Sequence, residues 1–184
     1  MRLESLQDQF QQRIAVVGGR AQTVPDLEAA LGYVVRLTQE LGGRTLAAPG
    51  WGQAELERIQ AVGQQAGLEV FSQGLRAQAK NIFCGFTPAD WGVAQTGTLV
   101  IDSLNEDLRL ATMLSEVHVA VLPAARLRPD LPSLQDELGG ILQRPQAYLA
   151  MITGPSRTGD IELILTMGAH GPRQVHVLIL EAAA

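Results

Sequence analysis

Residues 154–162 read Gly-Pro-Ser-Arg-Thr-Gly-Asp-Ile-Glu and gather hydroxyl, guanidinium and carboxylate groups in one short segment. The segment follows an expected strand and precedes an apolar run over 161–167, which we expect to be a short buried helix. Free N–H groups at a helix N-terminus favour anions. Ser156, Arg157 and Thr158 add donors that fit a carboxylate or a phosphate. The pattern predicts a small-anion site at the carboxyl end of a strand.

Two nucleotide-binding motifs are excluded in this segment. Gly154 and Gly159 have the separation of a phosphate loop, but Asp160 stands where that loop needs a lysine, and its charge would repel a triphosphate. The sequence contains no G-x-G-x-x-G either. Asp160 and Glu162 have two open interpretations: they favour a helix start, or one of them orients Arg157 or a substrate hydroxyl.

Other positions carry groups suited to the same kind of site. Thr96 and Thr98 place two hydroxyls at an expected hairpin, where Gly97 supplies a positive φ. Arg109 follows an acidic stretch and is either a surface ion-pair partner or a ligand arginine. His170, in a turn of small residues, is either a general acid or base or a solvated or cap-bonding side chain.

The remaining histidines and the cysteine point to structure rather than chemistry. His118 lies in an expected strand, on the face opposite its valine neighbours, and is predicted to be half-buried with its hydrogen bonds satisfied. His176 has the same pattern and receives no role. Cys84, the one cysteine, is predicted to be a buried thiol; it cannot form an internal disulfide or hold an iron–sulfur cluster. No catalytic triad or zinc motif is evident, so no catalytic residue is assigned and no metal ligand is expected.

The elements that must position these residues alternate between helix and strand. This alternation predicts a three-layer α/β fold, a mostly parallel sheet with helices on both faces. Ser133 and Asp136 have the spacing of a capping box. The expected helices cover 1–16, 26–41, 51–66 and 133–144, and the expected strands 44–48, 68–71, 117–122, 148–153 and 175–180, with a Gly-rich break at 18–23.

Composition narrows the class of protein. The chain has 184 residues, 46% of them hydrophobic and only 4% aromatic, which fits one domain over 1–184 with an aliphatic core. Its net charge is −5 and its 14 basic residues are scattered, so nucleic acid is not an expected partner. No apolar run is long enough to span a membrane, and the polar N-terminus does not read as a signal peptide, so a cytoplasmic location is expected.

Several of these motifs occur in an order that resembles the LUD-domain family, close to its lactate-utilisation C proteins. The resemblance is strong over residues 80–180, whereas the N-terminal helices agree only in general layout. One difference is Gln95, where the family usually has Glu. The ordered motifs are Ala94-Gln95-Thr96-Gly97-Thr98, Arg109, Val117-His118-Val119, residues 154–162 and Gly168-Ala169-His170-Gly171-Pro172-Arg173.

The resemblance implies a fold related to the ribose-phosphate isomerase and CoA-transferase-like group. It also implies an accessory, small-anion-binding role in the oxidation of L-lactate to pyruvate, with iron–sulfur clusters on a partner subunit and no cofactor bound by this chain. The alternative is a stand-alone enzyme or a sensor acting on a small hydroxy acid or sugar phosphate. The predicted substrate-binding residues are Thr96, Gly97, Thr98, Arg109, Ser156, Arg157, Thr158, Asp160, Glu162 and His170.

Overall fold

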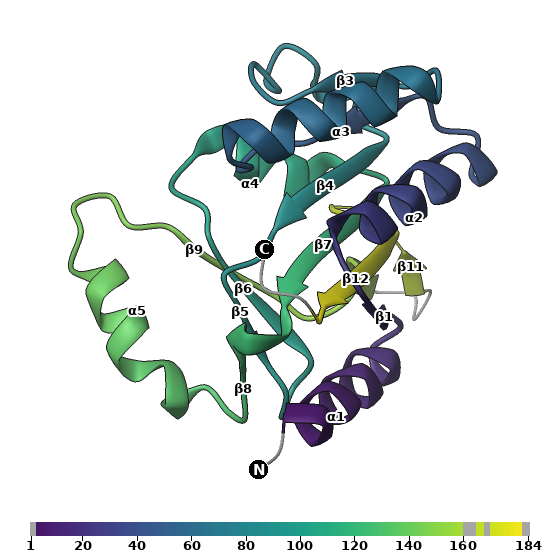
Figure 1. Cartoon of the computed structure of the whole chain (residues 1–184). Helices are drawn as coiled ribbons and strands as arrows, with labels where there is room; N and C mark the ends of the chain where they lie inside the picture. The colour runs from purple at the N-terminus through teal and green to yellow at the C-terminus, as the bar shows by residue number, and fades with distance from the viewer. Residues whose placement is uncertain (1–2, 160–164, 168–169, 182–184) are drawn as a thin grey trace.

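A six-stranded sheet lies at the centre of the computed structural model, which describes residues 3–159, 165–167 and 170–181 (Figure 1). Each strand runs parallel to its neighbours. The two seven-residue strands in the middle are rich in Val, Leu and Ile, as expected for strands covered on both faces. The order across the sheet is β1 (Arg20–Val24), β12 (Gln174–Leu180), β7 (Val117–Pro123), β4 (Cys84–Pro88), β2 (Thr45–Ala47) and β3 (Glu69–Phe71).

Helices α2 (Leu27–Glu40) and α3 (Gln53–Gln65) cover one face of this sheet (Figure 1). Leu31 and Val34 of α2 and Ile59 of α3 pack in one buried cluster with alternate residues of the central strands. The Asp26 side chain caps α2 by accepting a hydrogen bond from the N–H of Ala29 at 2.8 Å. This face is therefore a conventional helix-on-sheet layer.

The opposite face carries α1 (Leu3–Val16), α4 (Glu106–Leu114) and a second sheet. Leu6, Phe10 and Ile14 recur every four residues, so they form the buried stripe of α1. Helix α4 packs directly on β4: a Cβ added at Gly85 would lie 2.6 Å from the carbonyl oxygen of Ala111. The predicted three-layer arrangement with helices on both faces is thus confirmed.

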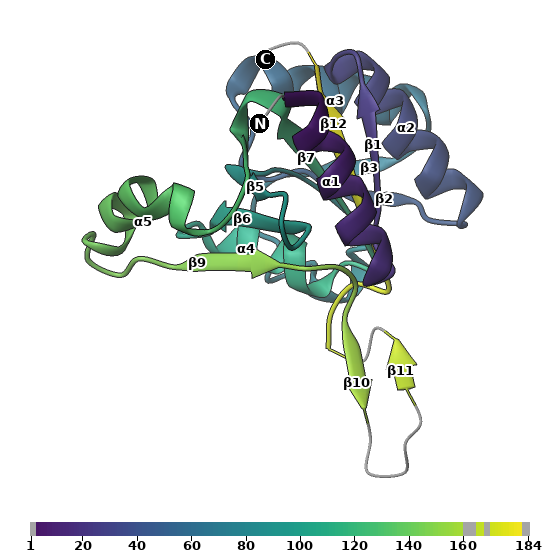
Figure 2. The same cartoon turned by 90° about the horizontal axis from the view of Figure 1, so that it is seen from below.

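The second sheet extends the α1 side to one flank of the molecule (Figure 2). Strands β5 (Trp91–Val93) and β6 (Thr98–Asp102) form the antiparallel hairpin that the sequence predicted, with Gly97 at φ +68° in its turn. The strand order across the second sheet is β8 (Leu127–Arg128), β5 (Trp91–Val93), β6 (Thr98–Asp102) and β9 (Leu149–Ile152). Helix α5 (Gln135–Leu142) packs beside this sheet. Short 3-10 turns occupy Ala79–Asn81, Ala124–Arg126 and Pro132–Leu134.

The predicted buried helix over 161–167 is wrong. Residues Leu165–Met167 form strand β11, which pairs antiparallel with β10 (Arg157–Gly159), and the pair projects away from the body of the molecule (Figure 2). Residues 161–164 lie outside the described part of the chain. A short apolar run fits a helix or a strand equally well by periodicity alone, and here strand pairing decides between them.

Other differences from the sequence-based prediction concern short elements. The expected break over 18–23 contains β1, and α4 was not predicted. The capping box at Ser133 is wrong, because its Oγ donates to the Asp130 carboxylate at 2.5 Å while α5 begins without a side-chain cap. The other predicted helices and strands are confirmed, with ends that shift by up to a few residues.

Candidate functional site

The direction of the chain reverses between β2 and β4, two neighbours in the parallel sheet. From β2 the chain passes through α3 to the outer strand β3, whereas from β4 it continues on the other face and reaches β7 on the opposite side. In wound α/β sheets, ligands bind at the carboxyl ends of the strands at such a point. A cavity of about 580 Å³ lies there, and we call it the carboxyl-edge cleft; its lining includes Gly50, Pro88, Asp90, Asp102, Asn105 and Arg144.

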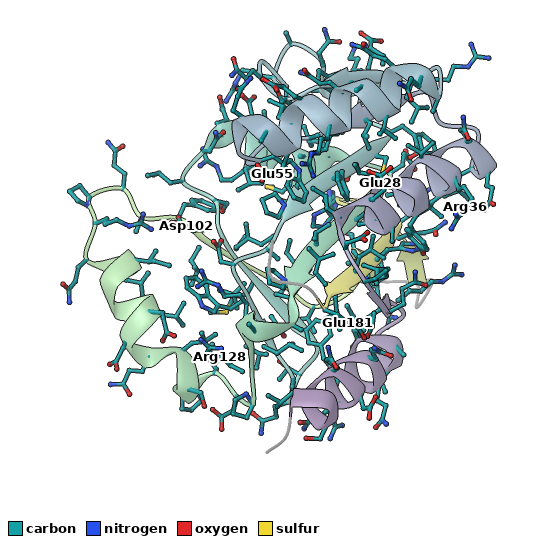
Figure 3. The ribbon with its side chains drawn as sticks, in the orientation of Figure 1. Glu28, Arg36, Glu55, Asp102, Arg128 and Glu181 are labelled. Atoms are coloured by element: carbon teal, nitrogen blue, oxygen red, sulfur yellow. The ribbon has the colours of Figure 1, made fainter. Side chains whose placement is uncertain are left out.

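Two carboxylates dominate the carboxyl-edge cleft. Asp90 accepts a hydrogen bond from the backbone N–H of Asp102 at 2.7 Å. Arg144 forms an ion pair with Oδ2 of Asp102, the side chain labelled in Figure 3. The other oxygen of Asp102 is buried and has no hydrogen-bond partner among the described residues. Burial raises the pKa of the Asp90 carboxyl, and the charge of Asp102 adds to the rise.

The start of α4 forms one wall of this cleft. Asn105 caps the helix, with its side-chain oxygen accepting from the N–H groups of Asp107 at 2.8 Å and Leu108 at 3.4 Å. The Asp107 carboxylate in turn accepts from the backbone N–H groups of Gly74 and Leu75 at 3.2 and 2.8 Å. Sequence reasoning treats this stretch as an acidic loop and misses the site, although an asparagine followed by two acidic residues is a signal for a helix start.

Arg109 lies on this side of the molecule. Its Nη1 donates to the carbonyls of Ser103 at 2.6 Å and Leu104 at 2.8 Å, and its guanidinium lies 4.9 Å from the centre of the Tyr148 ring. These described contacts include no ion pair, although the charge of Arg109 contributes to the lowered pKa of the Glu106 carboxyl, after the larger effect of Arg76. Arg109 closes the loop before α4, at the opposite sheet edge from Arg157.

The Thr-Gly-Thr turn and the segment beginning at Gly154 meet at the C-terminal end of α1, beside the amino ends of the parallel strands. A Cβ added at Gly97 would lie 2.4 Å from the backbone nitrogen of Ile14. At Gly154, which has φ +84°, it would lie 2.9 Å from Cγ2 of Val17. Glycine is required at both positions because α1 approaches each backbone so closely.

A row of hydroxyls lies at this point. Thr98 Oγ1 is 2.7 Å from Thr96 Oγ1 and 2.7 Å from Thr153 Oγ1. Three hydroxyl protons serve two hydrogen bonds, so within this row one O–H remains able to donate. When Thr98 donates one of these bonds, the free O–H lies on Thr96 or Thr153, and both of these residues are exposed.

Arg157 stands on the same side of the molecule. Its Nη2 donates to the carbonyl of Val17, just after α1, and its side chain is exposed. The backbone N–H of Ser156 donates to the carbonyl of Pro172 at 2.9 Å, just before β12. We call Thr96, Thr98, Thr153, Ser156 and Arg157 the amino-edge cluster.

The structure thus divides the predicted site residues. It brings Thr96, Gly97 and Thr98 together with Ser156 and Arg157, and places Arg109 elsewhere. His170 is exposed, and the adjacent Gly171 lies beside Ser156. The backbone of Thr158 belongs to β10, and Asp160 and Glu162 lie outside the described residues.

The segment follows the carboxyl end of a strand, β9, as predicted, but the helix expected after it is wrong. Strand β9, which leads into it, runs antiparallel to β6 in the second sheet and points to the amino edge of the parallel sheet. The donors there are side chains, since Arg157 begins strand β10 rather than a helix.

Both buried histidines stay neutral near pH 7. His118 is fully buried rather than half-buried, with Nε2 2.9 Å from Thr87 Oγ1 and Nδ1 lacking a partner in the described chain. His176 lies 2.6 Å from the Tyr33 hydroxyl and 3.0 Å from Gln174 Oε1, beside a cavity of about 200 Å³. Burial lowers the pKa of each imidazole to about 4.

Cys84 is buried, as predicted, and burial raises the pKa of its thiol to about 12. Among residues 3–159, 165–167 and 170–181, no group of three or more His, Cys, Asp or Glu side chains is arranged to hold a metal ion. None of the helices described has the length and apolar character needed to cross a membrane.

Comparison with known proteins identifies relatives of the chain. Residues 7–180 match the family model of the LUD domain. The chain is 30% identical to the uncharacterised protein YkgG of Escherichia coli over 80% of this chain and 67% of that protein. It is 31% identical to lactate utilization protein C of Halalkalibacterium halodurans over 56% of this chain and 46% of that protein.

The fold has a solved counterpart in the crystal structure of a DUF162 family protein from Deinococcus radiodurans. The two share a TM-score of 0.68 and 16% identity, and the match covers 98% of this chain and 99% of that one. The curated relatives are longer than the regions that match this chain. In four of them the matched region spans 43% to 67% of the relative's own length, with 43% for an uncharacterised protein of Neisseria meningitidis.

Proposed function

Because the chain belongs to the LUD-domain family, we propose that it binds a small carboxylate as an accessory subunit of L-lactate utilisation. Relatives from Halalkalibacterium halodurans and Geobacillus kaustophilus carry the name lactate utilization protein C. The proposed location is the cytoplasm, and the proposed ligand is L-lactate or its oxidation product pyruvate.

The observation that carries this proposal is the convergence of two distant motifs on the end of α1. A carboxylate needs charge-assisted and neutral donors close together. The exposed Arg157 guanidinium has five N–H donors, of which its described contact to Val17 uses one. The threonine row offers one O–H at the same edge. We therefore place the carboxylate at the amino-edge cluster, with His170 beside it.

The oxidation itself needs an electron acceptor. L-Lactate loses two electrons and two protons as it becomes pyruvate. Iron–sulfur clusters are held typically by four cysteine thiolates, and this chain has one cysteine, buried and with a raised pKa. These residues do not fit a cluster. We assign the clusters, and the electrons from lactate, to a separate iron–sulfur subunit.

A thermal-shift titration tests the binding site. L-Lactate or pyruvate at a hundred times its dissociation constant is expected to stabilise the native protein by about 2.7 kcal/mol. Arg157→Ala should abolish the shift. Arg173→Ala is the matched control, because Arg173 is also exposed and pairs with Glu116 at 3.6 Å. An unchanged shift in Arg157→Ala, or no shift with any small carboxylate, contradicts the proposed site.

A genetic experiment tests the role. Deleting the gene should prevent growth on L-lactate, and the native chain should restore growth whereas Arg157→Ala should not. The native chain should also co-purify with a protein containing iron and labile sulfide. Normal growth of the deletion strain and no such partner would overturn the accessory role. Lactate oxidation by the isolated chain with an artificial electron acceptor would instead identify a stand-alone enzyme.

A further inference from the structure

The carboxyl-edge cleft is not used by the proposed lactate site. Its volume of about 580 Å³ falls within the range of small-molecule sites, about 300–1,000 Å³, and is far larger than L-lactate needs. It also lies at the opposite edge of the parallel sheet from Arg157. We propose that this cleft is a second ligand site, which binds a molecule with neighbouring hydroxyl groups, a sugar or a nucleoside ribose, through Asp90 and Asp102.

The charges of the cleft select against an anion. Three acidic side chains line it: Asp102 is paired with Arg144 and Glu106 with Arg76, so Asp90 is the carboxylate left without an arginine partner among the residues described. A carboxylate or phosphate entering here would meet net negative charge. A neutral ligand that donates hydrogen bonds would not, so the cleft and the amino-edge cluster differ in the ligands that they favour.

The carboxylates of Asp90 and Asp102 are hydrogen-bond acceptors and therefore favour a ligand that donates hydrogen bonds. Asp102 Oδ1 has no hydrogen-bond partner among the residues described, but it is buried out of reach of solvent, so a ligand hydroxyl binds it only after a local side-chain shift that opens it to the cleft. Asp90 lies beside it, since its carboxylate accepts from the Asp102 N–H at 2.7 Å. Two adjacent carboxylates suit two adjacent hydroxyls, as when an acidic side chain binds ribose in dinucleotide-binding folds.

The protein also holds these acceptors in position before a ligand arrives. Arg144 fixes the Asp102 carboxylate and the Asp102 backbone fixes that of Asp90. Gly50 lies at φ +84° opposite α4, where an added Cβ would be 3.2 Å from Leu108 Cδ1. A larger residue there would narrow the cleft between the ends of β2 and β4.

Isothermal titration of the full chain with defined probes tests this site. The probes are adenosine, D-ribose and D-glucose, with 2′,3′-dideoxyadenosine as the probe that lacks the hydroxyl pair. We expect at least one hydroxylated probe to bind and the dideoxy compound not to bind. Binding of adenosine or ribose alone identifies a ribose site, whereas binding of glucose identifies a more general sugar site.

Two isosteric variants locate the binding. Asp90→Asn keeps an acceptor for the Asp102 N–H, so it should fold normally and weaken the hydroxylated probe by about tenfold or more. Asp136→Asn, on the exposed side of α5, is the matched control and should bind as the native chain does. L-Lactate titration should be unchanged in Asp90→Asn, which separates this site from the proposed lactate site. The inference is overturned if no hydroxylated probe binds, if the dideoxy compound binds equally well, or if both variants bind alike.

Discussion

The two edges of the parallel sheet are built from different chemistry. At the carboxyl edge, carboxylates line a cavity and are held by an ion pair and a backbone N–H. At the amino edge, hydroxyls and a guanidinium lie at the surface around the end of α1. Acceptors are therefore concentrated at one edge and donors at the other.

The difference shows how one sheet can separate two binding preferences. The amino-edge cluster depends on the docking of α1, because Gly97, Gly154 and Arg157 all contact residues at or after its last turn. The carboxyl-edge cleft depends on the loop before α4 and its cap. Perturbing one support should leave the other edge unchanged.

Truncating the main anchor of α1 should have the largest effect. Phe10 is fully buried and packs near Gly92 of β5, so Phe10→Ala should reduce the free energy of unfolding by about 3–5 kcal/mol, as measured by urea denaturation. L-Lactate affinity should fall as well, because α1 positions the amino-edge cluster. Leu31→Ala, on the other face of the sheet, should destabilise the protein but leave lactate affinity intact; equal loss of affinity in both variants would contradict the dependence on α1.

Adding a methyl group between the hairpin turn and α1 should have the next largest effect on stability. Gly97→Ala adds a Cβ close to the Ile14 backbone at a positive φ and should destabilise the protein by about 3 kcal/mol. Gly67→Ala is the matched control: it has φ +75° with no atom within 4 Å of the added Cβ, so it should cost only about 1 kcal/mol. Equal losses in thermal unfolding would show that α1 does not pack against the turn.

Acid should weaken the sheet that both edges share. His118 and His176 have folded pKa values of about 4 against an ordinary 6.5, so the unfolded chain binds protons first as the pH falls. The stability that the two neutral imidazoles contribute to the folded state is fully present above pH 6.5 and is lost as the pH falls toward 4. Between pH 7.5 and pH 5, each histidine should cost about 2 kcal/mol of stability.

The variant His176→Gln isolates one histidine. Denaturation curves at several pH values should show a shallower loss of stability in this variant than in the native chain. Identical pH dependence in the two proteins would mean that His176 is not held neutral by burial.

Removing the α4 cap should have the smallest effect and act on the carboxyl edge. Asn105→Ala should lower the free energy of unfolding by about 1 kcal/mol, since two N–H groups lose their acceptor. Asn105→Asp keeps the acceptor and should restore stability. Binding of the hydroxylated probe should weaken in the alanine variant while L-lactate binding stays constant; the reverse pattern would contradict the assignment of the two edges.

Sequence patterns predicted much of the fold because its helices and buried strands are regular. The alternation of helices and strands and the Thr-Gly-Thr hairpin are both visible as local patterns in the sequence. Strand β1 was missed because Arg20–Val24 carries mostly polar, half-exposed residues, and β11 was assigned to a helix because its pairing with β10 is not local.

The candidate sites were predicted only in part for a similar reason. Thr96 and Arg157 were identified by side-chain type. The edge of the sheet at which they lie depends on the direction of β9, which pairs with β6 far away in the sequence. The carboxyl-edge cleft joins Gly50, Asp90, Asp102 and Arg144 from four separate segments. No spacing in the sequence links these residues, so only the topology of the sheet reveals the cleft.

The most direct test of the account is an NMR titration of the ¹⁵N-labelled native chain with L-lactate. Binding at the amino-edge cluster predicts that the amide signals of Gly97, Thr98 and Ser156 shift, while those around the carboxyl-edge cleft do not. Shifts confined to Gly50 and Asp102, or no shifts at saturating lactate, would contradict it.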